Sequence, residues 1–425
     1  MSVQVGEGRR FYGWPLVGIG FLVYGLGIGP GYYSWGFFAP EIMADIGLTR
    51  EQVGQIFGAF TLTFAVAGPT AAWGIRRFGL RGTVTVGALV AALGFWLVSR
   101  AESVSDLFLS YSLVGGMGIG LSTVLPAQTL PVFWFKRYRA RATAIILMGA
   151  AVVGGLATPV DDLILRHWDW RTGWVLISGV SLLVALIAAI FLRNKPEDLG
   201  QRRDGRRADD PPTNDEAGTA PEAKAAGAMG DWTLGQAVRT PQFALALFAG
   251  MTNTIPWRVL TAHGRLHLED LGFTPTVAAA ILGVRVGVSA AGRLSGALGD
   301  FLPPRVVFAI ALVINGIGLG GLVIADTRSV AYASVVLLGV GYGAAYISIP
   351  VVFARLFGRS AFVGTAGLRI AITGLVGYVA PTWAGAAADR TGSYGGSLIV
   401  LMAFCFLGAL AILRCRRPER IPTAS

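Results

Sequence analysis

Long apolar runs separated by short polar segments account for most of this 425-residue chain. A transmembrane helix needs about 20 consecutive apolar residues, and reading the runs in this way gives about twelve spans. We place them at residues 12–38, 51–75, 82–100, 105–131, 140–164, 172–193, 239–262, 275–300, 304–325, 329–356, 361–388 and 394–414. Only 14% of the residues are charged, against about 25% in soluble domains. The sequence therefore predicts an all-α membrane protein with twelve transmembrane helices.

Basic residues gather in every second loop of this pattern. If the spans alternate in direction, one side of the membrane receives Arg9, Arg10, Arg76, Arg77, Arg81, Lys136, Arg137, Arg139, Arg141, Arg355, Arg359, Arg414, Arg416 and Arg417. Cytoplasmic loops carry such an excess of Lys and Arg. We therefore expect a multi-pass protein of the cell (inner or plasma) membrane with both termini cytoplasmic. The net charge of +11 is explained by these loops and does not indicate nucleic-acid binding.

A polar segment divides the spans into two groups of six. Residues 194–231 are rich in Pro, Gly, Asp and Ala, a composition that cannot form a packed core. We interpret residues 194–238 as a flexible cytoplasmic linker that ends in a short amphipathic helix near 232–239. The expected domains are an N-terminal six-helix bundle (1–193) and a C-terminal six-helix bundle with a short tail (239–425).

The two groups of spans repeat each other at an offset of about 225 positions. Residues 45–54 (DIGLTREQVG) match 270–279 (DLGFTPTVAA), and 29–31 (GPG) fall against 254–256 (TIP). Proline and glycine are thus expected to interrupt spans one and seven at matching depth, a pattern that marks a binding region between repeats. The glycine runs at 116–120 and 339–343 also correspond. They make Thr123 and Tyr346 approximate symmetry mates.

Residues 278–300 form an apolar, small-residue span that carries Arg285 and Arg293 without an acidic residue between them. A guanidinium inside a bilayer costs several kcal/mol unless it faces a partner, a cavity or a ligand. Our hypothesis is that a transported anion supplies the counter-charge. The alternative is that either arginine reaches backbone carbonyls or lipid headgroups instead.

Chemistry of other kinds has little support in the sequence. The glycine-rich runs lie inside apolar spans without the strand–helix context of a dinucleotide site, and no nucleophile–base set appears at a plausible spacing. Cys405 and Cys415 are about 15 Å apart on a helix, too far for a disulfide. We expect no enzyme activity, no cofactor and no metal.

Several local segments resemble the major facilitator superfamily, and within it the microbial monocarboxylate-porter and oxalate/formate-antiporter-like group. They are 11–14 (FYGW), 134–139 (WFKRYR), 195–200 (KPEDLG), 263–272 (HGRLHLEDLG), 292–300 (GRLSGALGD) and 385–390 (GAAADR). The resemblance extends over nearly the whole chain. It implies two pseudo-symmetric six-helix bundles around a central cavity.

The resemblance also implies roles for particular positions. Arg293, in the GRLSGALGD segment of span eight, corresponds to the arginine that binds the substrate carboxylate, and His263 to a histidine that lines the site. A lysine of span eleven is replaced here by Thr373, with Arg369 one turn earlier. The acidic residue that couples protons in animal monocarboxylate carriers is replaced by Ser289. Positions with a gating or motif role are Arg77, Asp300, Asp389 and Arg390.

Other polar residues near the two expected breaks are weaker candidates. Arg285 could line the cavity or be structural, and Arg258 is assigned to a ring contact or the outer interface. Hydroxyl or amide groups come from Tyr32, Tyr33, Thr123, Gln128, Asn253 and Tyr346. Asp161 and Asp162 are the nearest candidates for intramembrane carboxylates, although we favour the end of a loop for both.

We therefore expect a secondary active transporter that moves a small mono- or dicarboxylate by rocking of its two halves. The expected substrate contacts are Arg293, Arg369, Arg285, His263, Tyr346, Thr123, Tyr32, Tyr33 and Asn253. A proton or a counter-anion is the candidate coupling partner, and a monomer in the lipid bilayer is expected. A drug or amphiphile exporter of the same fold, and a transporter-like receptor without flux, remain as alternatives.

Overall fold

The computed structural model describes residues 11–205, 232–294 and 302–416, except for the side chains of residues 359, 360, 362 and 363. The first half of the chain contains α1 (Gly13–Ile46), α2 (Arg50–Val98), α3 (Val104–Leu107), the π-helix η1 (Phe108–Gly115), α4 (Gly116–Ser122), α5 (Val124–Trp134), α6 (Arg139–His167) and α7 (Trp170–Phe191). The short helices η2 (Pro196–Leu199), η3 (Arg203–Gly205) and α9 (Leu234–Val238) follow. The second half contains α10 (Pro241–Asp270), α11 (Pro275–Arg293), α12 (Pro304–Val323), α13 (Arg328–Thr391) and α14 (Gly395–Arg414).

The helices confirm the predicted twelve passages. Ten helical stretches of the described chain are long and apolar enough to cross a membrane. One of them, α2, turns back on itself at Gly79 and crosses twice. The remaining passage is α10, which has 30 residues but carries many polar side chains. Its polarity comes from its position at the junction of the two halves, where most of these side chains are buried.

Two sharp reversals are made by glycine rather than by a loop. Gly79 in α2 (φ 76°, ψ 172°) and Gly358 in α13 (φ 74°, ψ −175°) adopt a backbone conformation that residues with a Cβ avoid. Each follows a phenylalanine, Phe78 or Phe357. The repeated turn joins spans two and three, and spans ten and eleven, with the same geometry in each half.

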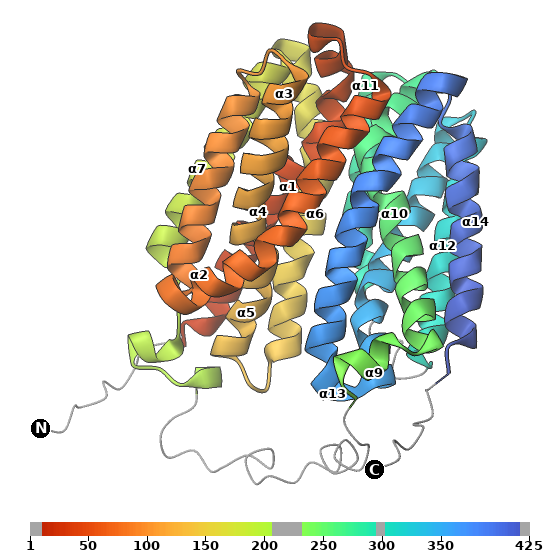
Figure 1. Cartoon of the computed structure of the whole chain (residues 1–425). Helices are drawn as coiled ribbons and strands as arrows, with labels where there is room; N and C mark the ends of the chain where they lie inside the picture. The colour runs from red at the N-terminus through yellow and green to blue at the C-terminus, as the bar shows by residue number, and fades with distance from the viewer. Residues whose placement is uncertain (1–10, 206–231, 295–301, 417–425) are drawn as a thin grey trace, which may run out of the picture.

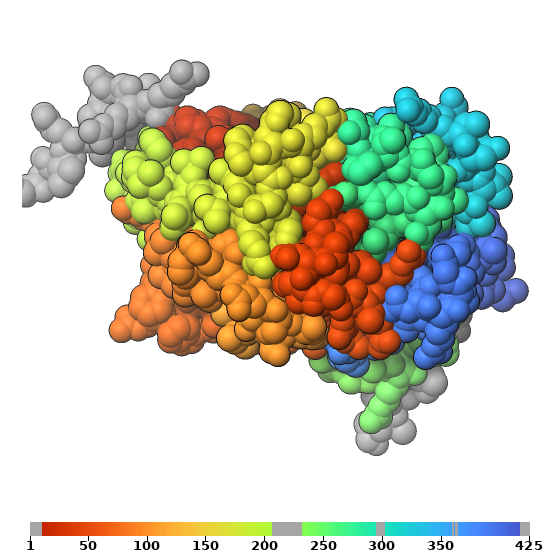
Figure 2. All heavy atoms as spheres, turned by 90° about the horizontal axis from the view of Figure 1, so that it is seen from above, coloured from red at the N-terminus to blue at the C-terminus, as the bar shows by residue number. Residues whose placement is uncertain are grey.

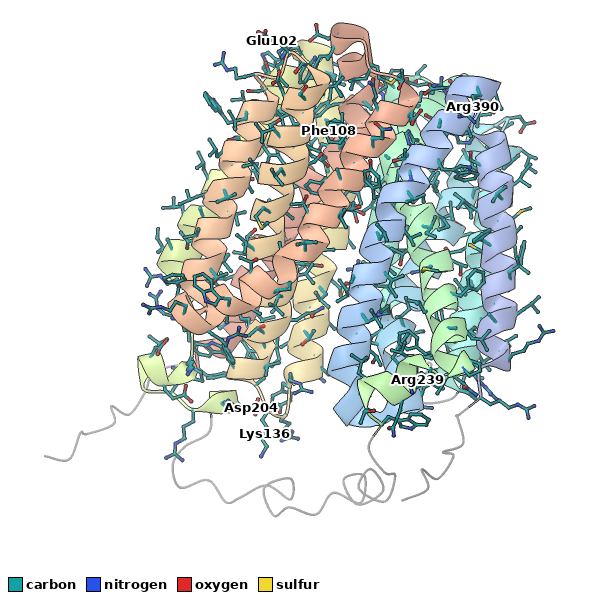
Figure 3. The ribbon with its side chains drawn as sticks, viewed as in Figure 1. Glu102, Phe108, Lys136, Asp204, Arg239 and Arg390 are labelled. Carbon is teal, nitrogen blue, oxygen red and sulfur yellow. The ribbon has the colours of Figure 1, made fainter. Side chains whose placement is uncertain are left out.

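The halves stand side by side as two bundles, α1–α7 and α10–α14 (Figure 1). We call the face at which α1 begins and α14 ends the lower face, and the opposite one the upper face. Lys136, Asp204 and Arg239 lie at the lower face, whereas Glu102 and Arg390 lie at the upper face (Figure 3). Every charged residue labelled in that view is at one of these two ends.

The expected interruptions of spans one and seven are wrong. Helix α1 continues through Pro30 and Pro40, and α10 continues through Pro256. A proline removes one backbone hydrogen bond, and neighbouring helices in a bundle allow this without ending the helix. The irregular backbone lies instead in span four, where η1 precedes a break at Thr123 (φ −117°, ψ −85°).

The start of the polar segment between the halves is ordered, which differs from the expected flexible linker. Asp204 accepts hydrogen bonds from the backbone N–H groups of Lys136 and Arg137, and Gln201 accepts one from the N–H of Tyr12. Residues 195–205 therefore pack under the first bundle, while 206–231 lie outside the described residues. The short helix expected near 232–239 is confirmed as α9.

The two halves meet most closely towards the upper face, along a surface that we call the upper seam. A Cβ added to Gly36 of α1 would lie 1.9 Å from the carbonyl oxygen of Thr261 in α10. A Cβ added to Gly54 or Gly385 would lie 2.3 or 2.2 Å from a backbone oxygen across the contact of α2 and α13. Seen from above, residues of α1 and α2 lie directly against those of α13 and α10 (Figure 2). Glycine thus allows backbone-to-backbone contact that closes this face.

Candidate functional site

Arg285 of α11 is buried in the second bundle, with 2% of its surface exposed. Its guanidinium lies 4.2 Å from the ring centroid of Trp257, and Nη2 donates to the Thr261 hydroxyl at 3.1 Å. Nε has no hydrogen-bond partner in the described part of the chain. Aromatic and hydroxyl groups offset only part of the cost of a buried charge, so this cation is incompletely compensated.

Arg293 lies two turns nearer to the lower face on the same helix and is half-buried. Its Nη1 donates to the carbonyl oxygen of Leu147 in α6, across the junction of the two halves. The guanidinium also lies 5.3 Å from the ring centroid of Tyr346 in α13, and its Nε has no partner among the described atoms. Arg293 therefore contacts both bundles and retains a free donor.

Arg369, in the second passage of α13, is half-buried and interacts with Tyr346 as well. Its side chain makes no ion pair within the described residues, and Thr373 one turn later directs its hydroxyl to the Arg369 carbonyl oxygen. Arg293 thus contacts the Tyr346 ring, and Arg369 acts on the same tyrosine through its charge. That the two arginines bind one carboxylate together stays a prediction of the sequence analysis.

Arg258 of α10 adds a further, half-buried guanidinium, which sequence reasoning assigned to a ring contact or the outer interface. The structure corrects this: Nη1 donates to the Thr373 carbonyl oxygen at 2.8 Å, and the side chain interacts with Tyr32 of α1. A Cβ on Gly377 would lie 1.3 Å from Nη1. Only glycine at that position leaves room for the guanidinium against α13.

We call Arg258, Arg285, Arg293 and Arg369 the central arginines. Tyrosines from both bundles surround them: Tyr24, Tyr32 and Tyr33 of α1, and Tyr342 and Tyr346 of α13. No carboxylate in the described ranges forms an ion pair with any central arginine. Guanidinium groups bind carboxylates bidentately. The arrangement can therefore hold a small anion between the halves.

His263 lies away from this group, near the upper face. Its Nε2 is 2.9 Å from the Pro381 carbonyl oxygen, and its Nδ1 is 3.1 Å from the Tyr394 hydroxyl. A neutral imidazole that donates from Nε2 and accepts at Nδ1 satisfies both contacts. Both ring nitrogens are thus occupied by the second bundle itself.

Thr123 and Asn253 are directed into the interiors of their own bundles. The Thr123 hydroxyl donates to the Ile119 carbonyl oxygen at 2.6 Å. Asn253 accepts from Asn315 at 2.9 Å and borders a small hollow that Arg285 also lines. Asn253 therefore neighbours the buried end of the central arginines, whereas Thr123 is occupied by its own helix.

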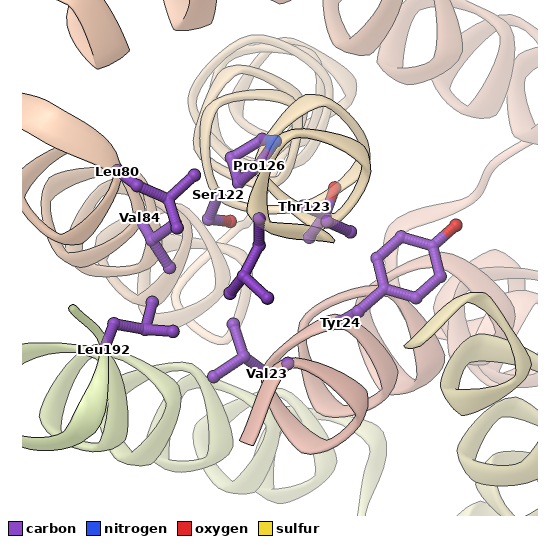
Figure 4. A pocket seen from close by; sticks show the side chains of 11 residues that line it. Val23, Tyr24, Leu80, Val84, Ser122, Thr123, Pro126 and Leu192 are labelled. Atoms are coloured by element: carbon purple, nitrogen blue, oxygen red, sulfur yellow. The ribbon is translucent and has the colours of Figure 1, made fainter. Parts of the chain in front are cut away.

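A second hollow lies inside the first bundle (Figure 4). Most of its lining is apolar, and the hydroxyls of Ser122 and Thr123 are bonded to their own helix. In Figure 4 the hydroxyl of Tyr24 points away from this lining. The hollow offers no charged group and does not suit an anion.

The residues predicted for gating have different surroundings. Arg77 is exposed and lies against the ring of Phe78, and Arg390 is exposed at the upper face. Asp389 accepts from the backbone N–H groups of Arg50 and Glu51 at 3.1 and 2.9 Å, and so joins α13 to the start of α2. Asp300 lies outside the described residues.

Sequence reasoning missed the ion pairs of the upper seam. Arg265 of α10 donates from Nη1 and Nη2 to Glu41 of α1 at 2.8 and 2.6 Å, and from Nε to Glu269 at 2.8 Å. Arg50 of α2 pairs with Asp270 through Nη2 and Oδ1 at 2.7 Å. The four-residue spacing of Arg265 and Glu269 was the available signal. Nothing local pointed to Glu41.

Comparison with known proteins places these observations in a family. Residues 17–363 match the family described as Major Facilitator Superfamily. Monocarboxylate transporter 13 of Rattus norvegicus is 28% identical over 86% of this chain and 77% of its own length. Monocarboxylate transporter 2 of Homo sapiens is 24% identical, over 90% and 81%.

A solved structure shares the fold. The bacterial homologue of the human lysosomal transporter Spinster, in an inward-facing and unoccupied conformation, superposes with a TM-score of 0.69 at 18% identity. It covers 98% of this chain and 100% of its own. The match over most of the sequence, the twelve passages and the paired bundles show that this chain belongs to the major facilitator superfamily of membrane transporters and is not an enzyme.

Proposed function

We propose that the protein is a secondary active transporter of a small mono- or dicarboxylate. The observation that carries the proposal is the set of central arginines, which lie between two bundles without a carboxylate partner in the described residues. The relatives are monocarboxylate transporters by name, which is consistent with an anionic substrate for this protein.

Arg293 is the proposed main anchor because it reaches both halves. Its free Nε and its contact with Tyr346 leave donors for a carboxylate, and its bond to Leu147 crosses to α6. A ligand moves a conformational equilibrium only by binding its two states differently. Competition between a substrate oxygen and the Leu147 carbonyl for the Arg293 guanidinium provides such a difference.

Arg369 and Arg285 take supporting roles in this proposal. Arg369 shares Tyr346 with Arg293 and would bind a second oxygen or a second carboxylate. Arg285, about 12 Å further along α11, would receive the anion nearer to the upper seam. Tyr32 and Tyr33 line this path from α1, together with Tyr24.

We also propose that the lower face is cytoplasmic, because Lys136, Arg137, Arg139 and Arg141 lie there. In this orientation the closed upper seam faces away from the cytoplasm. The proposed domains are 1–193 and 239–425, joined by 194–238, and the proposed working unit is the monomer.

The test is uptake of labelled lactate, pyruvate and oxalate into vesicles that contain the purified protein. Replacing Arg293 by Ala removes charge-assisted hydrogen bonds worth roughly 1.5–3 kcal/mol, so we expect uptake to fall about 10- to 100-fold. Arg293→Lys should recover part of it, because a point charge cannot bind both oxygens.

Arg355→Ala is the matched control. Arg355 is an exposed arginine of α13 near the lower face, and its loss should leave uptake unchanged. Wild-type rates in Arg293→Ala would remove the anchor role. Equal transport of neutral amphiphiles, insensitive to every central arginine, would favour an exporter instead.

A further inference from the structure

Asp161 of α6 is a buried carboxyl group at the upper seam. Only 2% of its surface is exposed, and α6 continues past it to His167 rather than ending in the loop that we expected. Its Oδ2 has no hydrogen-bond partner anywhere in the described ranges. An ionised carboxylate in such a place is strongly disfavoured.

Two side chains from other helices face Asp161. The hydroxyl of Ser34 in α1 lies beside it but forms no hydrogen bond within the described ranges, and the guanidinium of Arg265 in α10 acts on it through space. Arg265 acts on Asp161 by its charge alone, without an ion pair or a hydrogen bond to it. Its own hydrogen bonds are all directed elsewhere.

The donors of Arg265 are taken by other acceptors. Glu41 receives Nη1 and Nη2, Glu269 receives Nε, and the carbonyl oxygen of Phe37 also accepts from Nη1. Glu41 and Glu269 retain some contact with solvent, with 31% and 25% of their side chains exposed. The guanidinium thus stabilises these two carboxylates as anions and leaves Asp161 without a hydrogen bond from a cation.

The remaining charged groups near Asp161 are committed elsewhere. Its neighbour Asp162 pairs with Arg166 at 2.6 Å and accepts from Thr276 of α11. From α11, Arg285 is directed to Trp257 and Thr261. From α7, Arg171 pairs with Asp45 at 2.8 Å.

The charges do not balance if every group is ionised. Asp161, Glu41 and Glu269 would carry three negative charges around the single positive charge of Arg265. Glu41 and Glu269 are hydrogen-bonded to the guanidinium and partly exposed, whereas Asp161 is buried. The excess of negative charge decreases if Asp161 binds a proton and becomes a neutral carboxyl group.

We propose that Asp161 is a proton-binding site, filled when the upper seam closes and emptied when it opens. Asp161 and Glu41 belong to the first bundle and Arg265 to the second, so opening separates them and admits water to the carboxylate. The proposal deepens the transport function, since it gives the protein a titratable group that Ser289 cannot supply. The Ser289 hydroxyl donates to Val286 of its own helix.

Linkage gives the sign of the effect. We assume that one proton binds to Asp161 when the seam closes. The ratio of closed to open protein then falls by up to about tenfold for each rise of one pH unit, in the pH range where Asp161 is ionised in the open state. Low pH therefore favours the closed seam. His263 and His267 are buried and hydrogen-bonded only within the second bundle, so rocking does not change their partners.

The experiment measures the opening of the upper seam in the absence of substrate. Spin labels on cysteines at Glu102 and Arg328, exposed positions at the upper ends of the two bundles, report the distance between the halves in lipid nanodiscs from pH 5 to pH 8. Cys405 and Cys415 are replaced by Ser. We expect the closed fraction of the otherwise native protein to fall as pH rises, and Asp161→Asn to stay closed at every pH.

Asp162→Asn is the matched control, since it removes the adjacent carboxylate but not the proton site, and its pH dependence should persist. Ser34→Ala is a milder variant in case Asp161→Asn does not fold. It removes a polar group beside Asp161 and leaves the carboxyl in a more apolar site, which disfavours the ionised form, so the midpoint should move to higher pH.

A seam equilibrium that does not depend on pH, or an Asp161→Asn protein that keeps the native dependence, would overturn the proposal. Failure of carboxylate uptake would not, because the distance measurement needs no substrate. The two proposals can therefore fail separately.

Discussion

Arginines are buried in two regions of this molecule, and their surroundings differ. At the upper seam, Arg265 has 3% of its side chain exposed and binds two carboxylates, one from each bundle. Lower down, Arg285 is equally buried but is held by an indole ring, a hydroxyl and backbone oxygen. Among the described residues, Arg293 likewise contacts a tyrosine ring and a carbonyl oxygen but no carboxylate.

The difference distinguishes an arginine with a structural role from arginines that bind the substrate. The charge of a buried guanidinium that is paired with carboxylates is already compensated. Removing one partner of such an ion pair leaves an unpaired buried charge. A guanidinium without a carboxylate can accept one from solution. We therefore assign the upper seam to closing the protein and the central arginines to holding the transported anion.

The largest effect is expected when the upper seam loses its cation. Arg265→Met leaves Glu41 and Glu269 unpaired and should destabilise the closed seam by about 3 kcal/mol. The spin-label pair at residues 102 and 328 would then report a mainly open upper side, while carboxylate binding is retained. Arg285→Met should do the opposite, weakening binding with the seam still closed. If Arg265→Met and Arg285→Met changed seam opening and carboxylate binding in the same way, the two regions would not have separate roles.

A smaller effect is expected from adding one methyl group to the seam. In Gly36→Ala the Cβ meets the Thr261 carbonyl oxygen of the facing helix, so α1 and α10 must separate. Overpacking of this kind costs about 2 kcal/mol, which should lower the closed fraction and slow uptake. Gly18→Ala, on the same helix with nothing within 4 Å, is the control. A seam that tolerates Gly36→Ala would show that its backbone contact is not required.

The smallest effect concerns the rim of the seam. Arg50 and Asp270 pair across the bundles with 21% and 24% of their side chains exposed, so water and salt screen them. A double-mutant cycle with Arg50→Gln and Asp270→Asn should give a coupling of about 1 kcal/mol or less, diminishing at high salt. A coupling energy as large as the effect expected from the loss of Arg265 would mean that the exposed Arg50–Asp270 pair, and not the buried Arg265 cluster, holds the seam closed.

The fold was largely predictable because it depends on hydrophobic length and internal repetition. Apolar runs defined the twelve passages, and the repeat at about 225 positions defined the two bundles. The expected breaks at Pro30 and Pro256 were wrong, since a packed bundle tolerates proline inside a helix. The irregularity at Thr123 was not predicted, although Pro126 three residues later cannot donate a hydrogen bond to Ser122 and so disfavours a continuous helix there.

The site was predictable in part, for a physical reason. Arg285 and Arg293 stand out because a charge in an apolar run is costly wherever it faces. The surroundings of Arg258, Arg265 and Asp161 depend instead on which helix faces which, and on how far α6 extends beyond Pro159. Those are properties of two bundles in contact, and no single stretch of sequence contains them.

The most direct test of the account compares a carboxylate with its neutral counterpart. Thermal unfolding of the purified protein is followed with lactate and with lactamide, for the native sequence and for Arg293→Ala. We expect lactate to raise the unfolding temperature of the native protein, through preferential binding to the folded state, and to lose this effect in Arg293→Ala, with lactamide inactive on both. Equal stabilisation by lactamide, or a full lactate effect in Arg293→Ala, would contradict the claim that the central arginines hold the anion.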